Sequence, residues 1–436
     1  MSEPHFSHAS FTLWLGDCRE IMADFATCSV DAIVADPPYG LGFMGKEWDN
    51  FDPEAIHANA QKRARQKPIP AGGRNGDKPR GRTAAAWEAG RYDQSPKGNR
   101  AFQSWCESWA TEALRVLKPG GHMLVCGSPR TYHRLASGIE DAGFEIRDCL
   151  QWIFGSGFPK SLNLHGEWEG WGTALKPAYE PIVMARKPLA GTVATNVAAW
   201  GTGGLNIDGC RIGETIRING AGSLGSAGIY GAMERNDSET IAAGRWPANV
   251  LLDKEAAALL DSMSGETSER PRILHRNGLR AMDGWGFGAE SFGAVHADSG
   301  GASRYFYTAK TSRGEREFGL GDFAPMRRTD ADTRNSDAPG SNNPRLRTNE
   351  RHNDHPTVKP VDLMRWLCRL VMPPGGIVLD PFLGSGSTGM AALDEGFQFL
   401  GIDKEEHYLE IARRRITRRH TIEPLPQSDA GQASLL

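Results

Sequence analysis

The pattern of apolar and polar positions along the chain predicts an α/β protein. Phe11–Leu15 and Val30–Ala35 are short apolar runs rich in aromatic and β-branched residues, which is typical of buried strands. From residue 102 to 117, apolar side chains recur every three or four positions and predict an amphipathic helix. We expect this helix to stop at Lys118-Pro119-Gly120-Gly121, and His122–Cys126 to form the next buried strand.

Predicted strands and helices continue to alternate on both sides of a less regular middle stretch. Further strands are predicted at 144–154, 179–185, 377–380 and 401–403, and helices at 132–142, 361–371, from 390 and 405–419. Five arginines at the end of the last helix are expected to stabilise its dipole: Arg413, Arg414, Arg415, Arg418 and Arg419. From about 190 to 350 the apolar positions follow neither the period of a strand nor that of a helix. Clusters of glycine and aromatic residues recur there without a fixed spacing. This middle stretch is therefore predicted to be irregular.

A candidate catalytic motif, the tetrapeptide Asp36-Pro37-Pro38-Tyr39, directly follows the second predicted strand. The two prolines end the strand and remove two N–H donors, so that neighbouring carbonyls are left free. The carboxyl edge of the strands is where open α/β sheets place their chemistry. A carboxylate, free carbonyls and an aromatic ring at one point suit a planar ring that carries an exocyclic amino group. Taken alone, such a string is more often an ordinary turn.

A glycine-rich loop near the other end of the chain strengthens this interpretation. Residues 377–389 predict a strand, a turn and a helix, and Gly384, Gly386 and Gly389 fit G-x-G-x-x-G. Asp403 follows at the spacing expected for a carboxylate on ribose hydroxyls. The alternative is a nicotinamide or flavin dinucleotide site. However, Asp380 precedes the turn, where it suits a ligand ammonium better than a pyrophosphate, and too little chain follows for a second nucleotide-binding half.

These motifs, in this order, resemble the S-adenosylmethionine-dependent DNA amino-methyltransferases, and specifically their permuted β class, phage and prophage members in particular. The matching segments are Gly16-Asp17-Cys18, Asp36–Tyr39, Leu117–Gly121, Gly155–Lys160, Gly170–Pro177, His355–Pro360, Asp380–Thr388 and Gly401–Asp403. The resemblance implies a doubly wound, mostly parallel seven-stranded sheet with circularly permuted motif order. It also implies an inserted irregular target-recognition region.

The resemblance further implies roles for individual residues. The catalytic set is Asp36, Pro37, Pro38 and Tyr39, with Tyr39 stacking on a base flipped out of the duplex. The residues implied to bind S-adenosylmethionine are Asp17, Cys18, His355, Thr357, Lys359, Asp380, Pro381, Phe382, Gly384, Ser385, Gly386, Thr388 and Asp403. Two of these have equally good structural explanations: Asp17 as a helix N-cap and Lys359 as a solvated charge.

The expected activity is methyl transfer to the N6 amine of an adenine in double-stranded DNA, as in a restriction-modification system. N4-cytosine methylation is the first alternative, although such relatives more often carry Ser in place of Asp36. Methylation of an RNA or protein amine is the second, and its relatives usually show Asn there. A non-catalytic DNA-binding protein is disfavoured, because no expected catalytic position is lost. The recognition sequence, a cognate restriction enzyme and a homodimer are left open.

The composition of the chain limits the expected partners, metals and location of the protein. The 436 residues carry a net charge of −3, so any nucleic-acid footprint must be local. The seven cysteines form no C-x-x-C pair, and no cluster has metal-ligand spacing, so no metal is expected. Without a signal-peptide core or an apolar run long enough for a bilayer, a cytoplasmic protein without membrane contact is expected.

The basic stretch 61–100 holds eleven Lys and Arg against three Asp and Glu. It is either a solvated insertion or an arm on DNA phosphates, in which case Lys62, Arg63, Arg65 and Lys67 contact DNA. The expected organisation is a catalytic half (1–190, with a mobile basic insertion at 45–100), a target-recognition region (191–350), a cofactor-binding half (351–422) and a tail (423–436).

Overall fold

The computed structural model describes residues 2–41, 96–157, 161, 163–219, 240–267, 274–275, 291–292, 299–309, 313–323, 326–327 and 350–421. Lys62, Arg63, Arg65 and Lys67 lie outside these residues. The chain divides into two compact units. Unit 1 comprises residues 1–151, 179–206 and 310–436, and unit 2 comprises residues 152–178 and 207–309.

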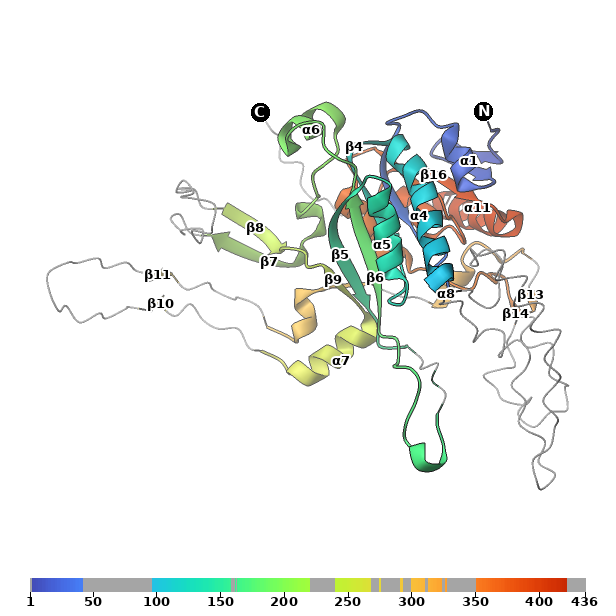
Figure 1. Cartoon of the computed structure of the whole chain (residues 1–436). Coiled ribbons are helices and arrows are strands. Elements are labelled where there is room, and N and C mark those ends of the chain that lie inside the picture. Colours follow the sequence, from blue (N-terminus) through green and yellow to red (C-terminus); the bar gives the residue numbers. More distant parts are fainter. Residues whose placement is uncertain are drawn as a thin grey trace, which may run out of the picture. The chain divides into compact units, whose positions relative to one another are not determined.

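A mostly parallel sheet forms the centre of unit 1 (Figure 1). Its strands run in the order β1 (Phe6–Ser7), β2 (Phe11–Leu15), β16 (Gln398–Asp403), β15 (Ile377–Asp380), β3 (Val30–Ala35), β4 (Leu117–Cys126), β6 (Tyr179–Arg186) and β5 (Glu145–Ile153). Neighbours from β2 to β4 pair in parallel, whereas β1 and β6 run antiparallel to β2 and β4. The predicted α/β class is confirmed, but the sheet has more strands than the seven that were expected, and β1 is a short strand at its edge.

Helices cover both faces of this sheet. The helices of unit 1 are α1 (Cys18–Ala23), α4 (Pro96–Val116), α5 (Tyr132–Asp141), α6 (Val193–Trp200), α8 (Arg313–Glu317), α9 (Val361–Val371), α10 (Ser387–Asp394) and α11 (Glu406–Thr421). Every residue of β3 is buried, and alternate residues of a strand point to opposite faces. Ile33 and Ala35 pack in one core with residues of α1, α4 and α5, while α9 contacts β3 and α10 contacts α9 and α11. Burial on both faces explains why β3 is apolar except for Asp31, whose carboxylate forms an ion pair with Lys118.

The structure differs from the expectation in several elements, and two of these differences concern β4 and α6. Helix α4 ends at Val116, close to the predicted stop, but Lys118-Pro119-Gly120-Gly121 already belongs to β4, which was expected to begin at His122. Its glycines allow the strand to bulge: Val30 pairs with Leu117, the register then shifts, and Ala32 pairs with His122. Helix α6 was not anticipated, although Thr192 caps its first turn and Gly201 ends it in a left-handed conformation. Both are recognisable signals of helix ends.

Unit 2 contains shorter elements. Strands β7 (Ile212–Asn219) and β8 (Thr240–Arg245) pair antiparallel, and β9 (Val250–Asp253) pairs in parallel with β12 (Tyr307–Ala309). Helix α7 (Lys254–Ser264) begins at Asp253, whose side chain accepts a hydrogen bond from the Ala256 amide. The remaining short elements are β10 (Leu274–His275), β11 (Ser291–Phe292) and the 3-10 turns Gly166–Trp168, Asp208–Cys210 and Ala302–Tyr305; the pair β13 (Met326–Arg327) and β14 (Glu350–Arg351) belongs to unit 1.

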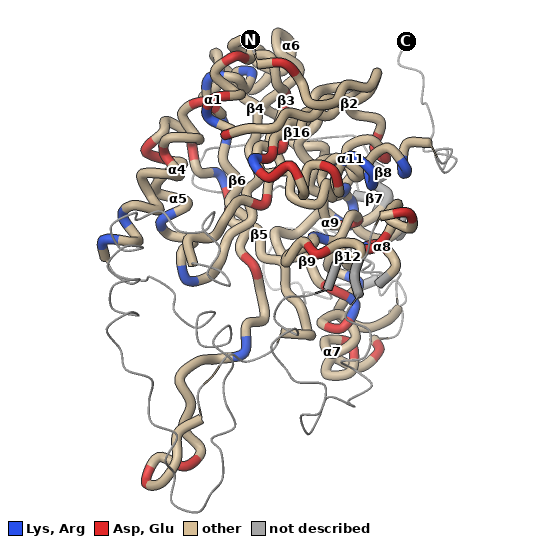
Figure 2. Tube along the Cα trace, turned by 90° about the vertical axis from the view of Figure 1, so that its right-hand side faces the viewer, with Lys and Arg blue, Asp and Glu red and all other residues tan. Residues whose placement is uncertain are grey.

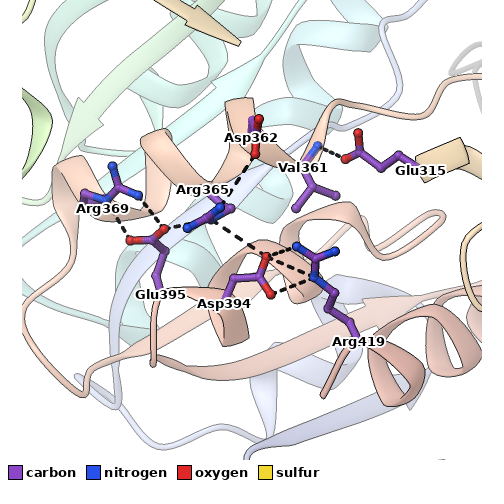
Figure 3. A network of polar contacts seen from close by, with 8 residues as sticks. All are labelled: Glu315, Val361, Asp362, Arg365, Arg369, Asp394, Glu395 and Arg419. Atoms are coloured by element: carbon purple, nitrogen blue, oxygen red, sulfur yellow. Dashed lines mark hydrogen bonds and ion pairs between the residues drawn. The ribbon is translucent and has the colours of Figure 1, made fainter. Parts of the chain in front are cut away.

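Acidic and basic positions are interspersed along the described chain (Figure 2). A polar network ties α9, α10 and α11 together (Figure 3). Arg365 and Arg369 donate to Glu395 at 2.6–2.9 Å, and Arg419 donates to Asp394 at 2.9 Å. The arginine-rich end of α11 is thus held by specific carboxylates and not by the helix dipole alone. No helix among the described residues is long and apolar enough to cross a membrane.

Candidate active site

The turn after β3 brings two predicted residues into direct contact. The hydroxyl of Tyr39 donates to Oδ1 of Asp36 at 2.8 Å. The turn is anchored from the other side, because the hydroxyl of Thr131, before α5, donates to the Tyr39 carbonyl at 2.6 Å. Pro37 is buried and Pro38 partly buried between them. The Asp-Pro-Pro-Tyr motif therefore presents a fixed carboxylate at the carboxyl end of β3.

Lys359 lies at this carboxylate and not at an open position. Lys359 is 6% exposed as a whole residue. Its ammonium donates to Oδ2 of Asp36 and to the Tyr39 hydroxyl, both at 2.9 Å. The interpretation of Lys359 as a solvated charge is therefore wrong. The segment before α9 runs along the edge where β3 ends, which buries the side chain. Burial lowers the pKa of Lys359, but the Asp36 and Glu180 carboxylates outweigh it and hold that pKa well above its usual range.

Glu180 completes the cluster and was not anticipated. One of its oxygens lies 3.0 Å from the Lys359 ammonium and 3.3 Å from the Tyr39 hydroxyl. Glu180 is the second residue of β6, which runs antiparallel to β4. The start of β6 therefore lies at the edge where the parallel strands end. The direction of this strand, which periodicity does not reveal, is the information that was missing.

The glycine loop after β15 encloses a buried carboxylate. Asp380 is 2% exposed and accepts hydrogen bonds from the Phe382 amide, at 3.0 Å, and from the Thr388 hydroxyl. Burial raises the pKa of Asp380 to about 7, and the nearby Asp36 adds to this effect. Among the described residues no cation forms an ion pair with Asp380. A buried carboxyl group without a positively charged partner in the protein can pair with a cationic group of a ligand.

Two glycines of this loop have a positive φ, which favours glycine. At Gly384, with φ +52°, a Cβ would lie 2.9 Å from the His355 ring. At Gly386, with φ +79°, a Cβ would lie 2.9 Å from that of Ala412 on α11. The loop is further held by Asp403, whose two oxygens accept from the amides of Gly384, at 2.7 Å, and Glu405, at 2.9 Å. Burial raises the pKa of Asp403 to about 6.

Other predicted cofactor residues are placed around this loop. The Asp17 side chain caps α1, since it accepts from the Arg19 amide at 2.9 Å, and Arg19 hydrogen bonds lower the pKa of Asp17. Cys18 is buried, which raises its pKa to about 12. The His355 ring lies 2.5 Å from the Thr357 carbonyl, and burial lowers the pKa of His355 to about 4. The Thr357 side chain is exposed.

Three further predicted residues, and Ser387, lie in this loop or directly after it. Phe382 packs against Trp105 and Trp109 with ring centroids 5.5 and 5.2 Å apart. Pro381 and Ser385 are buried. The Ser387 hydroxyl is buried as well and makes no hydrogen bond within the described part of the chain.

Arg415 is a second residue that was missed. It is fully buried and donates to the Ser385 carbonyl in the loop and to the Glu315 carbonyl, at 3.0 Å, in α8. Burial lowers the pKa of Arg415 to about 10, which leaves it charged at neutral pH. Its position on α11 predicts a dipole contact, but its actual partners are backbone carbonyls. Arg415 thus fixes the loop from behind.

Asp36, Asp380 and Asp403 follow or end the strands β3, β15 and β16, which are neighbours in the sheet. The arrangement combines a fixed acceptor carboxylate with a tight loop around a buried acid. Among the described residues there is no group of three or more His, Cys, Asp or Glu placed to hold a metal ion.

Comparison with known proteins agrees with this geometry. A family model described as DNA methylase, of the N6/N4 type, matches residues 30–414. The type II methyltransferase M.HindIII of Haemophilus influenzae is 27% identical over 197 residues, which cover 41% of this chain and 60% of that protein. The type II methyltransferase M2.DpnII of Streptococcus pneumoniae is 47% identical over 62 residues, which cover 14% of this chain and 23% of that protein.

The matches to solved structures have lower sequence identity. The cytosine-N4-specific PvuII DNA methyltransferase is 13% identical with a TM-score of 0.42, and the match covers 96% of this chain and 94% of that one. The structure of M1.HpyAVI is 15% identical with a TM-score of 0.37, and its match covers 93% and 98% of the two chains.

Proposed function

Because the chain belongs to the N6/N4 DNA methylase family, we propose that it methylates the N6 amine of an adenine in double-stranded DNA, with S-adenosylmethionine as the methyl donor. The observation that carries the proposal is the Asp36 carboxylate, held by Tyr39 and Lys359 at the end of β3. It stands close enough to the glycine loop to influence the pKa of Asp380. An amine acceptor and a cofactor loop thus share one edge of the sheet.

The residues act on the amine mainly through orientation. An exocyclic amine of adenine is a weak nucleophile, because its lone pair is delocalised into the ring. Asp36 and the Pro37 carbonyl can each accept one amino hydrogen, which favours a tetrahedral nitrogen with a directed lone pair. A carboxylate is too weak a base to deprotonate a neutral aryl amine, but it can receive the proton from the methylated amine afterwards. Tyr39 would stack on the flipped base.

The loop residues fit S-adenosylmethionine. The buried Asp380 carboxylate suits the positively charged end of that cofactor, and the buried Ser387 hydroxyl is a further polar group available there. Glycine at 384 and 386 lets the loop backbone close tightly against His355 and α11. When bound, the cofactor supplies a sulfonium methyl group as the electrophile. We propose that Asp403 and Asp17 contact its ribose and adenine.

Cofactor binding should depend on pH through Asp380. Its pKa of about 7 means that the acid is protonated below pH 7 in the free protein, whereas a bound cation favours the ionised form. Affinity should therefore fall as the pH drops below 7, by up to about tenfold per pH unit, and level off above it. Calorimetric titration from pH 5.5 to 8.5 measures this. In Asp380→Asn, binding should be weaker and flat above about pH 6.5, where Asp403, with a pKa of about 6, is mostly ionised; an unchanged slope there would assign the titration to another group.

The DNA contacts belong to the proposal as well. We propose that Lys62, Arg63, Arg65 and Lys67 bind phosphates, and that residues 191–350 recognise the target sequence. Incubation of the purified protein with labelled S-adenosylmethionine and DNA, followed by nucleoside mass spectrometry, tests the function. N6-methyladenine is the expected product. N4-methylcytosine alone would make the choice of base wrong but retain amine methylation, and transfer to RNA or protein alone would refute DNA as the substrate.

A further inference from the structure

Glu180 lies next to both side chains that hold the Asp36 carboxylate. Lys359 holds Oδ2 of Asp36, and Tyr39 holds Oδ1. One Glu180 oxygen lies within 3.3 Å of both of these holding groups. Glu180 therefore acts on both oxygens of Asp36, each through one intermediate residue. Its side chain is 25% exposed, and that of Lys359 is 7% exposed.

The charges of this cluster do not cancel. A pair of Asp36 and Lys359 alone would be neutral, and Glu180 makes the sum −1. Burial, together with the two carboxylates, raises the pKa of Tyr39 well above its usual range, so that Tyr39 stays neutral. An amine that receives a methyl group becomes positively charged as its lone pair is used. In a partly desolvated site, a net negative environment stabilises that charge.

We propose that Glu180 is a positioning residue for amine methylation, which holds Lys359 and Tyr39 on Asp36 and supplies the negative charge that Lys359 would otherwise cancel. This inference rests on the proposed function of the site. It requires no contact between Glu180 and the target base or the cofactor. Its effect should appear in the rate of methyl transfer, and cofactor affinity should not change.

Other titratable groups around the cluster define the pH at which to test it. They are Cys126 at the end of β4, whose pKa burial raises well above its usual range, Asp380, with a pKa of about 7, and His355, with a pKa of about 4. Above pH 8, Cys126 and His355 are neutral and Asp380 is ionised. Rates compared between pH 8 and 9 therefore report on the charge at Glu180 without a change at these groups.

The decisive variant is Glu180→Gln, which keeps the size of the side chain and an acceptor oxygen for Lys359 but removes the charge. Its single-turnover rate at saturating DNA and cofactor should fall by at least about tenfold, as expected for one nearby charge at intermediate dielectric. KM for DNA and the calorimetric affinity for S-adenosylmethionine should stay near wild type. Glu180→Asp, which keeps the charge, should recover part of the rate.

A matched control lies on the neighbouring strand β5, where Glu145 contacts the other end of β6. Glu145 accepts from Arg186 of β6 at 2.6 Å, and Glu145→Gln should leave the rate unchanged. A wild-type rate in Glu180→Gln would overturn the proposal. So would an equal loss of rate and cofactor affinity, because that pattern indicates a structural role.

A measurement without catalysis keeps this test separate from the proposed function. Urea unfolding of the cofactor-free wild type, Glu180→Gln, Lys359→Met and the double variant forms a double-mutant cycle. A clear coupling supports the contact, and additive effects would overturn the Glu180 proposal whatever the substrate. Absence of transfer to any DNA amine by the wild type would instead overturn the proposed function.

Discussion

Replacing Asp36 with alanine should reduce methyl transfer by at least about 100-fold while S-adenosylmethionine still binds. Asp36 faces the target amine from the end of β3, whereas the loop after β15 is built from other residues. The buried Lys359 ammonium keeps the Glu180 carboxylate at 3.0 Å, so it is not left without a partner. Single-turnover assays with labelled cofactor measure the rate, and calorimetric titration measures cofactor affinity.

Asp36→Asn is the matched control for this experiment. It preserves the volume of the side chain and one acceptor oxygen but removes the charge that receives the proton. Its transfer rate should lie between those of the wild type and the alanine variant. If either variant lost cofactor binding as completely as it lost transfer, the division between the Asp36 motif and the glycine loop would be wrong.

Much of the fold follows from local sequence. Val30–Ala35 was recognisable as a strand because all six residues are apolar or small except Asp31, and helix α9 has the predicted limits Val361–Val371. The edge that carries Asp36, Asp380 and Asp403 could be predicted too, because the carboxyl ends of parallel strands meet at one edge. In each case the signal lies within about ten residues of the side chain concerned.

The contacts that sequence analysis missed are long-range. Glu180 meets Tyr39 across 141 positions, and Lys359 meets Asp36 across 323. Neither pairing leaves a periodic or spacing signal in one sequence, and the role of Glu180 requires the direction of β6. Arg415 lies among five arginines of α11, but only helix packing decides that it is the one turned inward to the Ser385 carbonyl.

Gly386→Val should abolish cofactor binding. Gly386 precedes α10 with φ +79°, a conformation that a β-branched residue rarely adopts. A Cβ there would also lie 2.9 Å from the Cβ and 3.0 Å from the Cα of Ala412, so the loop must move away from α11. That movement displaces the Asp380–Gly386 loop proposed to hold S-adenosylmethionine. Calorimetric titration should detect no binding, and methyl transfer should be lost with it.

Gly396 offers a control that separates backbone strain from displacement of the loop. It has the same φ of +79°, but nothing lies within 4 Å of a Cβ built on it. Gly396→Val should therefore cost some stability yet bind the cofactor normally. Gly386→Ala, with a smaller side chain, should bind weakly while circular dichroism shows a folded protein. Normal cofactor affinity in a folded Gly386→Val would mean that the close approach of the loop to α11 is not needed for binding.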